Sequence, residues 1–482
     1  MNINMIVYVL GWVLQLEAAL LLLPMVCALI YKEIWAFHAL GVAAIIAFLI
    51  GTLATLRKPK RTSYYIREGF VVCALSWMVM SLIGALPFYI SKTIPHYIDA
   101  VFEIVSGFTT TGASILSDVE HLGKGLLFWR SFSHWVGGMG VLVLVLTILP
   151  LGGGYNMMIM KAESPGPDVS KMVPRVADTA KALYKIYFLL TLAWVIIFML
   201  SGMSLFDSLC IAFGSAGTGG FAVRNSGMAD YSMFSQFLIT IAMLMFGVNF
   251  NVYYLCEKRK FKDALGCEEA RMYLIFVLSA TLFIAFNILK LCGGDLIYSL
   301  HHSFFTVSSL ITTTGFSTLD FDTWSQPCQM IILFLMFSGA CAGSTGGGIK
   351  VSRIMILFKE IGKELLVLIH PEAVKHIRME GKKVDKSVVA SVNSYLVMYV
   401  LIILVSIFII SFDGFDFVTN FSAVAATFNN IGPGLGAVGP VRNYAEYSDL
   451  SKIVLTIDML AGRLEILPMM ILFLPRTWRK GN

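Results

Sequence analysis

Charged residues are scarce in this sequence, and their scarcity excludes a soluble globular fold. Only 14% of the 482 residues are Asp, Glu, Lys or Arg, whereas soluble domains typically carry about 25%. Hydrophobic residues make up 57% of the chain, and the mean hydropathy is +0.78. This composition predicts an all-α polytopic membrane protein.

Motifs for metal binding and disulfide formation are missing as well. The eight cysteines are scattered, without a Cys-x-x-Cys pair or a histidine at ligand spacing. His301 and His302 lack further ligands, so we interpret them as packing residues. The basic residues form no face of a soluble domain, so nucleic acid is not expected as a partner. No covalent cofactor is expected.

Ten apolar runs are long enough to cross a membrane. A helix needs about 20 apolar residues to span roughly 30 Å of hydrocarbon. The first run lacks the basic n-region and cleavage site of a secretory signal, so we expect it to remain as a helix. The ten runs are 5–30, 36–56, 70–91, 126–150, 183–203, 234–256, 272–292, 328–358, 388–411 and 452–475.

Four shorter half-apolar segments lie between these runs. Each has about 12 residues and as a helix would reach roughly 18 Å, which is enough to enter a bilayer but not to cross it. We therefore expect four re-entrant helices, near residues 98–110, 206–217, 299–312 and 416–428.

The basic residues predict the orientation of the chain. Positively charged loops stay on the cytoplasmic side of a membrane. Most of the 36 Lys and Arg residues fall in the C-terminal tail and in loops 57–69, 151–185, 257–271 and 350–387, and the short segments fall on the opposite side. Both termini are therefore expected in the cytoplasm, and the short helices are expected to enter from outside.

The order of long helix, short helix, loop and long helix occurs four times after two N-terminal spans. Such internal repetition indicates one structural unit used repeatedly. We expect four pseudo-symmetric helix–pore-helix–filter-loop–helix repeats around one pore. The expected divisions are 1–64 for the two N-terminal transmembrane helices and 65–160, 161–265, 266–380 and 381–482 for the four pore repeats.

The loop after each short segment is rich in threonine or asparagine and glycine. The four loops read SGFTTTGAS, GSAGTGGFA, SLITTTGFS and TFNNIGPGLG. A ring of backbone carbonyls can replace the hydration shell of a potassium ion, and glycine lets carbonyls approach closely. One such loop is compatible with an ordinary helix C-cap. Four loops at matched positions indicate an ion pore.

Seven motifs extend along the chain from about residue 65: SGFTTTGAS, WRSFSHWVGGMGVLVL, GTGGFA, ITTTGFST, GACAGSTGGGIK, NNIGPGLG and DMLAGRLEIL. Together they resemble the Trk, Ktr and HKT superfamily of potassium transporters. Within it, the two additional N-terminal spans favour the TrkH-type membrane subunit of bacterial Trk potassium uptake systems.

The resemblance implies one filter glycine in each repeat. In the second loop Gly219 and Gly220 are adjacent, and alignment of GGF with the TGF of the third loop selects Gly220. Gly112, rather than serine, at the first filter position implies a preference for potassium over sodium. The expected filter residues are Thr110, Thr111, Gly112, Thr218, Gly219, Gly220, Thr313, Thr314, Gly315, Asn430, Ile431 and Gly432. Potassium is expected on the carbonyls of Thr111, Gly112, Gly220, Thr314, Gly315 and Gly432.

The second long helix of the third repeat contains a glycine-rich stretch, SGACAGSTGGGIK at residues 338–350. Each glycine in a helix interior costs about 1 kcal/mol relative to alanine, so the helix is expected to break there. The break could be passive, and a phosphate-binding loop is disfavoured because Ile349 separates the glycines from the lysine. The resemblance implies an intramembrane gate made of Gly339, Gly343, Ser344, Thr345, Gly346, Gly347, Gly348 and Arg463.

Arg463 is a charge within the last apolar run. An intramembrane arginine should face a pore, a carboxylate or backbone carbonyls. One interpretation is an ion pair with Asp458, and the resemblance supports an alternative in which Arg463 projects into the permeation path as a barrier.

Other charged and aromatic residues have simpler interpretations. Carboxylates in the first turns of the short helices are expected to complement the helix dipole or to attract cations. Aromatic residues at the start of a span are expected to anchor it at the membrane interface. These residues are Asp99, Glu103, Asp207 and Asp416, and Trp129, Arg130 and Trp135.

These observations favour potassium-selective uptake through a channel-like pore in a bacterial inner membrane. A sodium- or proton-coupled cation symporter of the same fold is the alternative. An organic-solute transporter would favour a twofold rather than a fourfold repeat, and the spans contain no catalytic constellation. The resemblance implies a homodimer regulated by a cytoplasmic TrkA-type subunit that binds NAD or another nucleotide, and the basic loops could contact membrane lipids.

Overall fold

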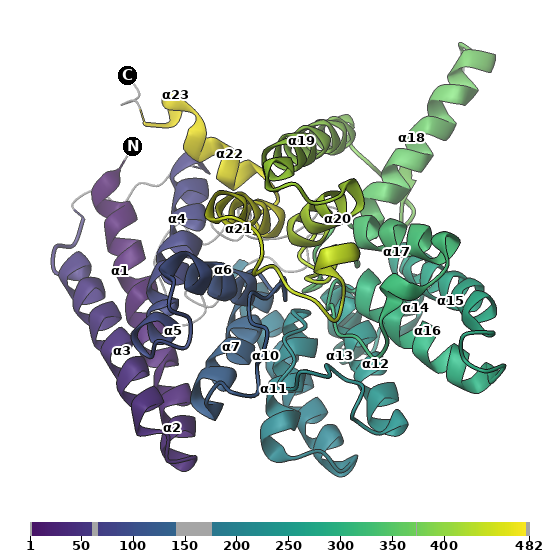
Figure 1. Ribbon diagram of the computed structural model, residues 1–482. Helices are drawn as coiled ribbons and strands as arrows, with labels where there is room; N and C mark the ends of the chain where they lie inside the picture. The colour runs from purple at the N-terminus through teal and green to yellow at the C-terminus, as the bar shows by residue number, and fades with distance from the viewer. Residues whose placement is uncertain (1, 60–65, 141–175, 373, 479–482) are drawn as a thin grey trace.

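The chain circles a common centre in the computed structural model (Figure 1). The structure describes all residues except 1, 60–65, 141–175, 373 and 479–482. The regular secondary structure of the described residues is helical apart from a hairpin of β1 (Arg378–Met379) and β2 (Lys382–Lys383), which pair antiparallel. The expected helical fold class is therefore correct for the described part of the chain.

Two spans at the N-terminus form one edge of the molecule, drawn in purple in Figure 1. Their helices are α1 (Ile3–Leu20), α2 (Leu22–Ile30) and α3 (Ile34–Thr55). A Cβ built on Gly11 would lie 2.8 Å from the carbonyl oxygen of Gly51. Glycine at both positions therefore lets the backbones of α1 and α3 touch, as small residues do between membrane helices.

The remaining helices form four successive sets, each with a long helix, a short helix and, beyond a loop, a further helix of 13 to 15 residues, which we call the post-loop helix. The first two sets contain α4 (Ile66–Gly84), α5 (Leu86–Ile90), α6 (Tyr97–Phe108) and α7 (Lys124–Gly138), then α10 (Val176–Leu200), α11 (Leu205–Gly217), α12 (Met233–Gly247), α13 (Phe250–Glu257) and α14 (Phe261–Leu265). The third contains α15 (Glu268–Ile288), α16 (Leu296–Ile311), η1 (Phe321–Thr323), α17 (Gln326–Ser338) and α18 (Val351–Ile369). The fourth contains α19 (Lys386–Ile410), η2 (Ser411–Asp413), α20 (Phe417–Phe428), η3 (Gly436–Val438), α21 (Asp449–Arg463), α22 (Leu467–Phe473) and α23 (Pro475–Trp478).

The packing between the sets is cyclic. The post-loop helix of each set packs on the short helix of the next: α7 on α11, α12 on α16, α17 on α20 and α21 on α6. The last contact joins the end of the chain to the first set, and α22 also packs on α4. The colours of Figure 1 accordingly run round the centre and return to their start. This closure brings the four loops that follow the short helices to one place.

The four short helices match the expected re-entrant segments. Helices α6, α11, α16 and α20 have 12, 13, 16 and 12 residues, too few to cross about 30 Å of hydrocarbon. Three of them begin at polar N-caps, Ser204, Asp295 and Asp416, whose side chains accept backbone N–H groups of the first turn. These caps satisfy donors that a buried helix start would leave unpaired.

Several of the ten expected spans are not single continuous helices. Six described helices are long and apolar enough to cross a membrane, or seven if α12 and α13 count as one span bent by 88°. The runs at 328–358 and 452–475 are broken after α17 and α21. The run at 126–150 is helical to Gly138, and its second half lies outside the described residues. The break after α17 falls in the glycine-rich stretch where a break was expected. The break after α21 and the bend between α12 and α13 lie in apolar sequence, so hydropathy alone does not reveal them.

Close packing accompanies two of these helix ends. A Cβ on Gly137 or Gly462 would collide with the carbonyl oxygen of Phe108 or Phe428, respectively. Each phenylalanine is the last residue of a short helix, so the post-loop helices of the first and fourth sets, α7 and α21, touch the ends of α6 and α20 at equivalent points.

Candidate functional site

Four loops share one backbone conformation. We call them loop A (Thr109–Gly112), loop B (Gly217–Gly220), loop C (Thr312–Gly315) and loop D (Asn429–Gly432). Their second residues have positive φ, at 56° for Thr110, 57° for Thr218, 59° for Thr313 and 56° for Asn430. Their fourth residues, Gly112, Gly220, Gly315 and Gly432, have φ of 80°, 76°, 82° and 95°. This match aligns Gly220 with the other three glycines.

The same hydrogen bonds end all four short helices. The amide of the third loop residue donates to the carbonyl five positions earlier, at 2.8 Å in every loop: Thr111 to Ser106, Gly219 to Gly214, Thr314 to Ser309 and Ile431 to Ala426. This is the pattern of a Schellman C-cap. Such caps normally place glycine at the left-handed position, whereas these loops place threonine or asparagine there. Left-handed backbone in these residues is strained, and such strain is concentrated at functional sites.

The four loops close a ring through their glycines. A Cβ on Gly112 would collide with the carbonyl oxygen of Gly219, one on Gly220 with Thr314, one on Gly315 with Ile431 and one on Gly432 with Thr111. Each contact joins one loop to the next, and the last returns to loop A. Glycine is required at these four positions because a backbone oxygen of the neighbouring loop occupies the space of a side chain.

Side-chain hydroxyl and amide groups form further hydrogen bonds within and between the loops. The hydroxyls of Thr109 and Thr111 lie 2.8 Å apart in loop A, and those of Thr312 and Thr314 lie 2.8 Å apart in loop C. The Asn430 amide of loop D donates to the Thr111 hydroxyl at 2.9 Å. Loops A and D are therefore linked by side chains as well as by backbone contact.

All four glycines line one side of the ring, at the base of a cavity of about 200 Å³. The segments that follow loops A and B meet at its rim. Asn225 accepts the Val119 amide at 2.8 Å and donates to the Asp118 carboxylate at 2.9 Å. The bond from Asn225, with others from the Glu120 amide and His121, lowers the pKa of the Asp118 carboxyl. This carboxylate therefore stays negatively charged to a lower pH than a free aspartate does.

The glycine-rich segment Gly339–Lys350 lies against the opposite side of the ring. The Gly347 amide donates to the Thr313 hydroxyl at 2.6 Å. A Cβ on Gly346 would lie 2.9 Å from the Thr312 carbonyl oxygen, and one on Gly347 would collide with that of Asn429. The segment therefore packs directly on loops C and D.

Backbone hydrogen bonds join the two ends of the glycine-rich segment. The Ile349 amide donates to Phe337 at 3.1 Å, the Lys350 amide to Ser338 at 3.0 Å and the Val351 amide to Ala340 at 3.1 Å. The segment is thus a closed excursion between α17 and α18.

The second set and helix α15 of the third set hold the glycine-rich segment in place. The Cys341 amide donates to the Gly247 carbonyl at 3.1 Å, and the Phe250 amide donates to Gly343 at 3.0 Å, both at the bend between α12 and α13. The buried Glu269 carboxylate accepts the amides of Ala342 at 2.7 Å and Ser352 at 3.0 Å. Glu269 was not among the residues that the sequence suggested, because only the fold brings it to the segment.

Arg463 connects the glycine-rich segment to the first set of helices. Its guanidinium donates to the Thr345 carbonyl at 2.7 Å and to the carbonyls of Gly137 and Gly138 at 2.6 Å each. The Asp458 carboxylate accepts a hydrogen bond from Ser406 at 2.8 Å. An intramembrane arginine was expected to face a pore, a carboxylate or backbone carbonyls, and these three hydrogen bonds of Arg463 are to backbone carbonyls.

Two expectations for residues near loop A are wrong. Glu103 lies in the middle of α6 rather than in its first turn, is fully buried and pairs with Arg130 at 2.6 Å. Trp129 and Arg130 are 0% and 2% exposed, so they do not anchor the helix at a lipid interface. The pairing joins residues 27 positions apart, and the expectations treated each residue only within its own segment.

The other carboxylates lie nearer to their expected places. Asp416 is the N-cap of α20 and accepts the Thr419 amide at 3.1 Å. Asp207 and Asp99 lie in the first turns of α11 and α6. Both also form ion pairs, Asp207 with Arg224 at 3.0 Å and Asp99 with Lys452 at 2.6 Å.

Comparisons with known proteins gave full-length similarity. The family model "TrkH: Cation transport protein" matches residues 38–480. The chain is 36% identical to the Trk system potassium uptake protein TrkH of Salmonella typhimurium, covering 100% of both chains. It is 35% identical to the Trk system potassium uptake protein TrkG of Escherichia coli, covering 99% of both.

A solved structure shares the fold. The crystal structure of the potassium transporter TrkH from Vibrio parahaemolyticus superposes with a TM-score of 0.88 at 33% identity. The match covers 99% of this chain and 100% of the other.

Proposed function

The chain belongs to the TrkH cation transport family, and on this basis we propose that loops A to D form the selectivity filter of one potassium pore. The protein is a Trk-type potassium uptake protein of the membrane rather than an enzyme. Potassium is its substrate.

The observation that carries the filter proposal is the closed ring of four loops with matched backbone angles. Extended loops of this kind can direct carbonyl oxygens at a dehydrated ion, which potassium needs in place of its hydration shell. The four helix sets are then four pseudo-symmetric repeats around one pore, with α1 to α3 outside them. The C-terminal ends of the four short helices add partial negative charge that favours a cation.

The glycine-rich segment and Arg463 are proposed as the gate. The segment packs on loops C and D, and Arg463 bonds to its Thr345 carbonyl. This position lies across the path of an ion that leaves the ring away from the cavity. The positive charge of Arg463 would add an electrostatic barrier to a cation there.

Rubidium uptake by the purified protein in liposomes tests the function. With potassium inside and tracer rubidium outside, we expect uptake that a large excess of external sodium does not block. The carbonyl oxygens of the ring would replace the hydration shell of potassium or rubidium, which are larger than sodium. Protein-free liposomes provide the control. Uptake that requires sodium or a proton gradient would support the coupled symporter instead, and uptake that sodium blocks would contradict the filter proposal.

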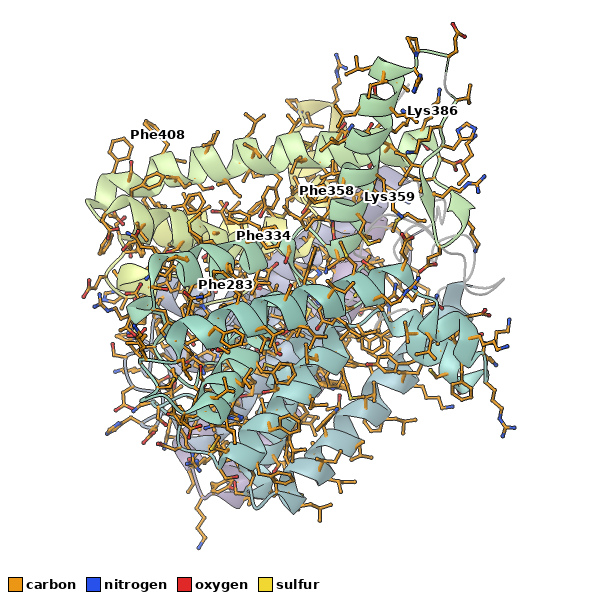
Figure 2. The ribbon with its side chains drawn as sticks, turned by 90° about the vertical axis from the view of Figure 1, so that its right-hand side faces the viewer. Phe283, Phe334, Phe358, Lys359, Lys386 and Phe408 are labelled. Atoms are coloured by element: carbon orange, nitrogen blue, oxygen red, sulfur yellow. The ribbon has the colours of Figure 1, made fainter. Side chains whose placement is uncertain are left out.

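We propose a bacterial inner-membrane location with both termini in the cytoplasm. Helix α19 supports the orientation: Figure 2 shows Lys386 at one end of this helix and Phe408 toward the other. The basic end lies with the basic 350–387 region, which the positive-inside rule places in the cytoplasm. That region could also receive a TrkA-type nucleotide-binding subunit and anionic lipid headgroups.

A homodimer is proposed through α18. The last turns of α18 leave the bundle (Figure 1), and Figure 2 shows Phe358 on this helix. Phe358, Ile361 and Leu365 are 65%, 55% and 57% exposed, and their spacing places them along one side of the helix. A second copy of the chain would cover this apolar stripe.

The stripe predicts the effect of charge on assembly. Phe358→Asp with Leu365→Asp is expected to convert a detergent-solubilised dimer to a monomer, because two charges would be buried without partners at the interface. Mass determination by light scattering measures the change. Phe408→Asp, on an exposed site of α19, is the matched control and should leave the mass unchanged. A dimer that survives both α18 changes would contradict this interface.

A further inference from the structure

Loop B differs from the other loops at its third position. Loops A, C and D have Thr111, Thr314 and Ile431 there, whereas loop B has Gly219. Gly219 is not among the described residues with positive φ, so its backbone conformation does not require glycine. Another cause must exclude a side chain from this position.

The imidazole of His134 occupies the missing space. A Cβ on Gly219 would overlap the ring atoms of His134, a fully buried residue of α7. The first residue of loop B is constrained as well, because a Cβ on Gly217 would collide with the His134 carbonyl oxygen. Helix α7 therefore lies directly behind loop B, and its histidine replaces the side chain that the loop lacks.

The imidazole of His134 also forms hydrogen bonds to two separate segments of the backbone. Its Nδ1 lies 2.7 Å from the Gly107 carbonyl, and its Nε2 lies 3.2 Å from the Phe221 amide nitrogen. A carbonyl can only accept and a backbone N–H can only donate, so the imidazole of His134 is neutral and carries its proton on Nδ1. In this form it joins the end of α6 to the residue that follows Gly220.

Arg130, one turn earlier on α7, holds the same segment. Its guanidinium donates to the Ala222 carbonyl at 3.0 Å and lies 3.5 Å from the centre of the Phe221 ring. The Glu103 carboxylate fixes this arginine and also accepts the Ile115 amide at 3.0 Å. The segments after loops A and B are therefore tied to one buried charge pair.

We propose that His134 and Arg130 are positioning residues that set the place of loop B in the ring and thereby the ion selectivity of the pore. This inference rests on the proposed filter. The carbonyl of Gly219 faces Gly112 of loop A, and Gly220 faces the Thr314 carbonyl of loop C, so a shift of loop B would move two of the four contacts between loops. An ion site made of carbonyls discriminates by the place and number of its oxygens.

A pair of substitutions tests the steric relation. Gly219→Ala alone is expected to reduce the preference for rubidium over sodium about tenfold, because its Cβ would meet the imidazole of His134. A change of this size lies within the interaction energies found between contacting residues. His134→Ala with Gly219→Ala should recover part of that loss. The measurements are rubidium uptake with and without excess sodium, together with the midpoint of thermal unfolding. No recovery in the double variant would overturn the proposal that the His134 imidazole occupies the space of a side chain at position 219.

Conservative variants separate positioning from simple stabilisation. His134→Gln keeps one donor and one acceptor and should retain more selectivity than His134→Ala. Arg130→Lys keeps the charge but cannot stack and bond in the same plane, so it should lower selectivity. If these variants lower total uptake and thermal stability without changing the ion preference, the residues are structural only.

Glu33→Gln is the matched control, because Glu33, the residue before α3, contacts α7 at the end away from loop B. The Glu33 carboxylate accepts the amides of Lys124 at 2.7 Å and Gly125 at 2.9 Å at the start of α7. This change loosens the helix without touching loop B, so selectivity should not change. Selectivity that is insensitive to Gly315→Ala would refute the filter itself, whereas sensitivity to Gly315→Ala but not to the α7 variants would refute only this inference.

Discussion

Gly315→Ala is expected to lower sodium-resistant rubidium uptake by about a hundredfold, which is the scale of loss when a preorganised site moves by about 1 Å. Gly315 has a φ of 82°, and an alanine there costs roughly 1 kcal/mol in backbone strain. Its Cβ would also collide with the Ile431 carbonyl oxygen and lie 2.9 Å from Pro433 Cδ. Loop C or loop D must therefore move.

Gly414→Ala is the matched control for backbone strain. Gly414 has a φ of 79° and nothing within 4 Å of its would-be Cβ. It should show the cost of the strained conformation in thermal stability but keep normal uptake and sodium rejection. Normal uptake by both variants would remove Gly315 from the filter.

Arg463→Gln is expected to raise rubidium uptake by the isolated protein about tenfold. The substitution removes a buried charge and hydrogen bonds to the carbonyls of Thr345, Gly137 and Gly138. Charge-assisted hydrogen bonds contribute about 1.5–3 kcal/mol each, so loss of even one could shift a closed gate toward opening by this factor. The initial rate of uptake in liposomes, normalised to reconstituted protein, measures the effect.

Arg463→Lys separates the two ways in which Arg463 could act. Lysine keeps the positive charge but lacks the planar set of donors that reaches three carbonyls. Uptake like the wild type would assign the effect to charge, and uptake like Arg463→Gln would assign it to the hydrogen bonds. If neither variant exceeds the wild-type rate, Arg463 is not part of a closed gate.

The position of the candidate filter could be predicted from sequence because its requirements are local. Threonine or asparagine, followed by glycine, recurs at the end of each short helix, and the choice of Gly220 over Gly219 agrees with the matched φ angles. The family likeness was also readable in contiguous motifs and is confirmed by the match over residues 38–480. Local chemistry, repeated four times, was sufficient for these inferences.

Contacts between distant segments could not be predicted in this way. His134 and Phe221 are 87 residues apart, and Arg130 and Ala222 are 92 apart. Nothing in the spacing of α7 indicates that its histidine would meet a glycine of the second set. The 88° bend between α12 and α13 was missed for a related reason. Hydropathy measures the affinity of a segment for lipid, and both arms of the bend are apolar.

The closed ends of the glycine-rich segment have a mechanical consequence for the membrane. The bonds from Ile349 and Lys350 back to Phe337 and Ser338 hold α17 and α18 together at the base of the excursion. In the proposed gate, the segment would leave the pore axis while these bonds persist, so the two helices need not separate. Opening of this kind leaves the cross-sectional area of the protein in the bilayer unchanged. Lateral tension does work only through a change in area, and it would therefore do no work on such a gate.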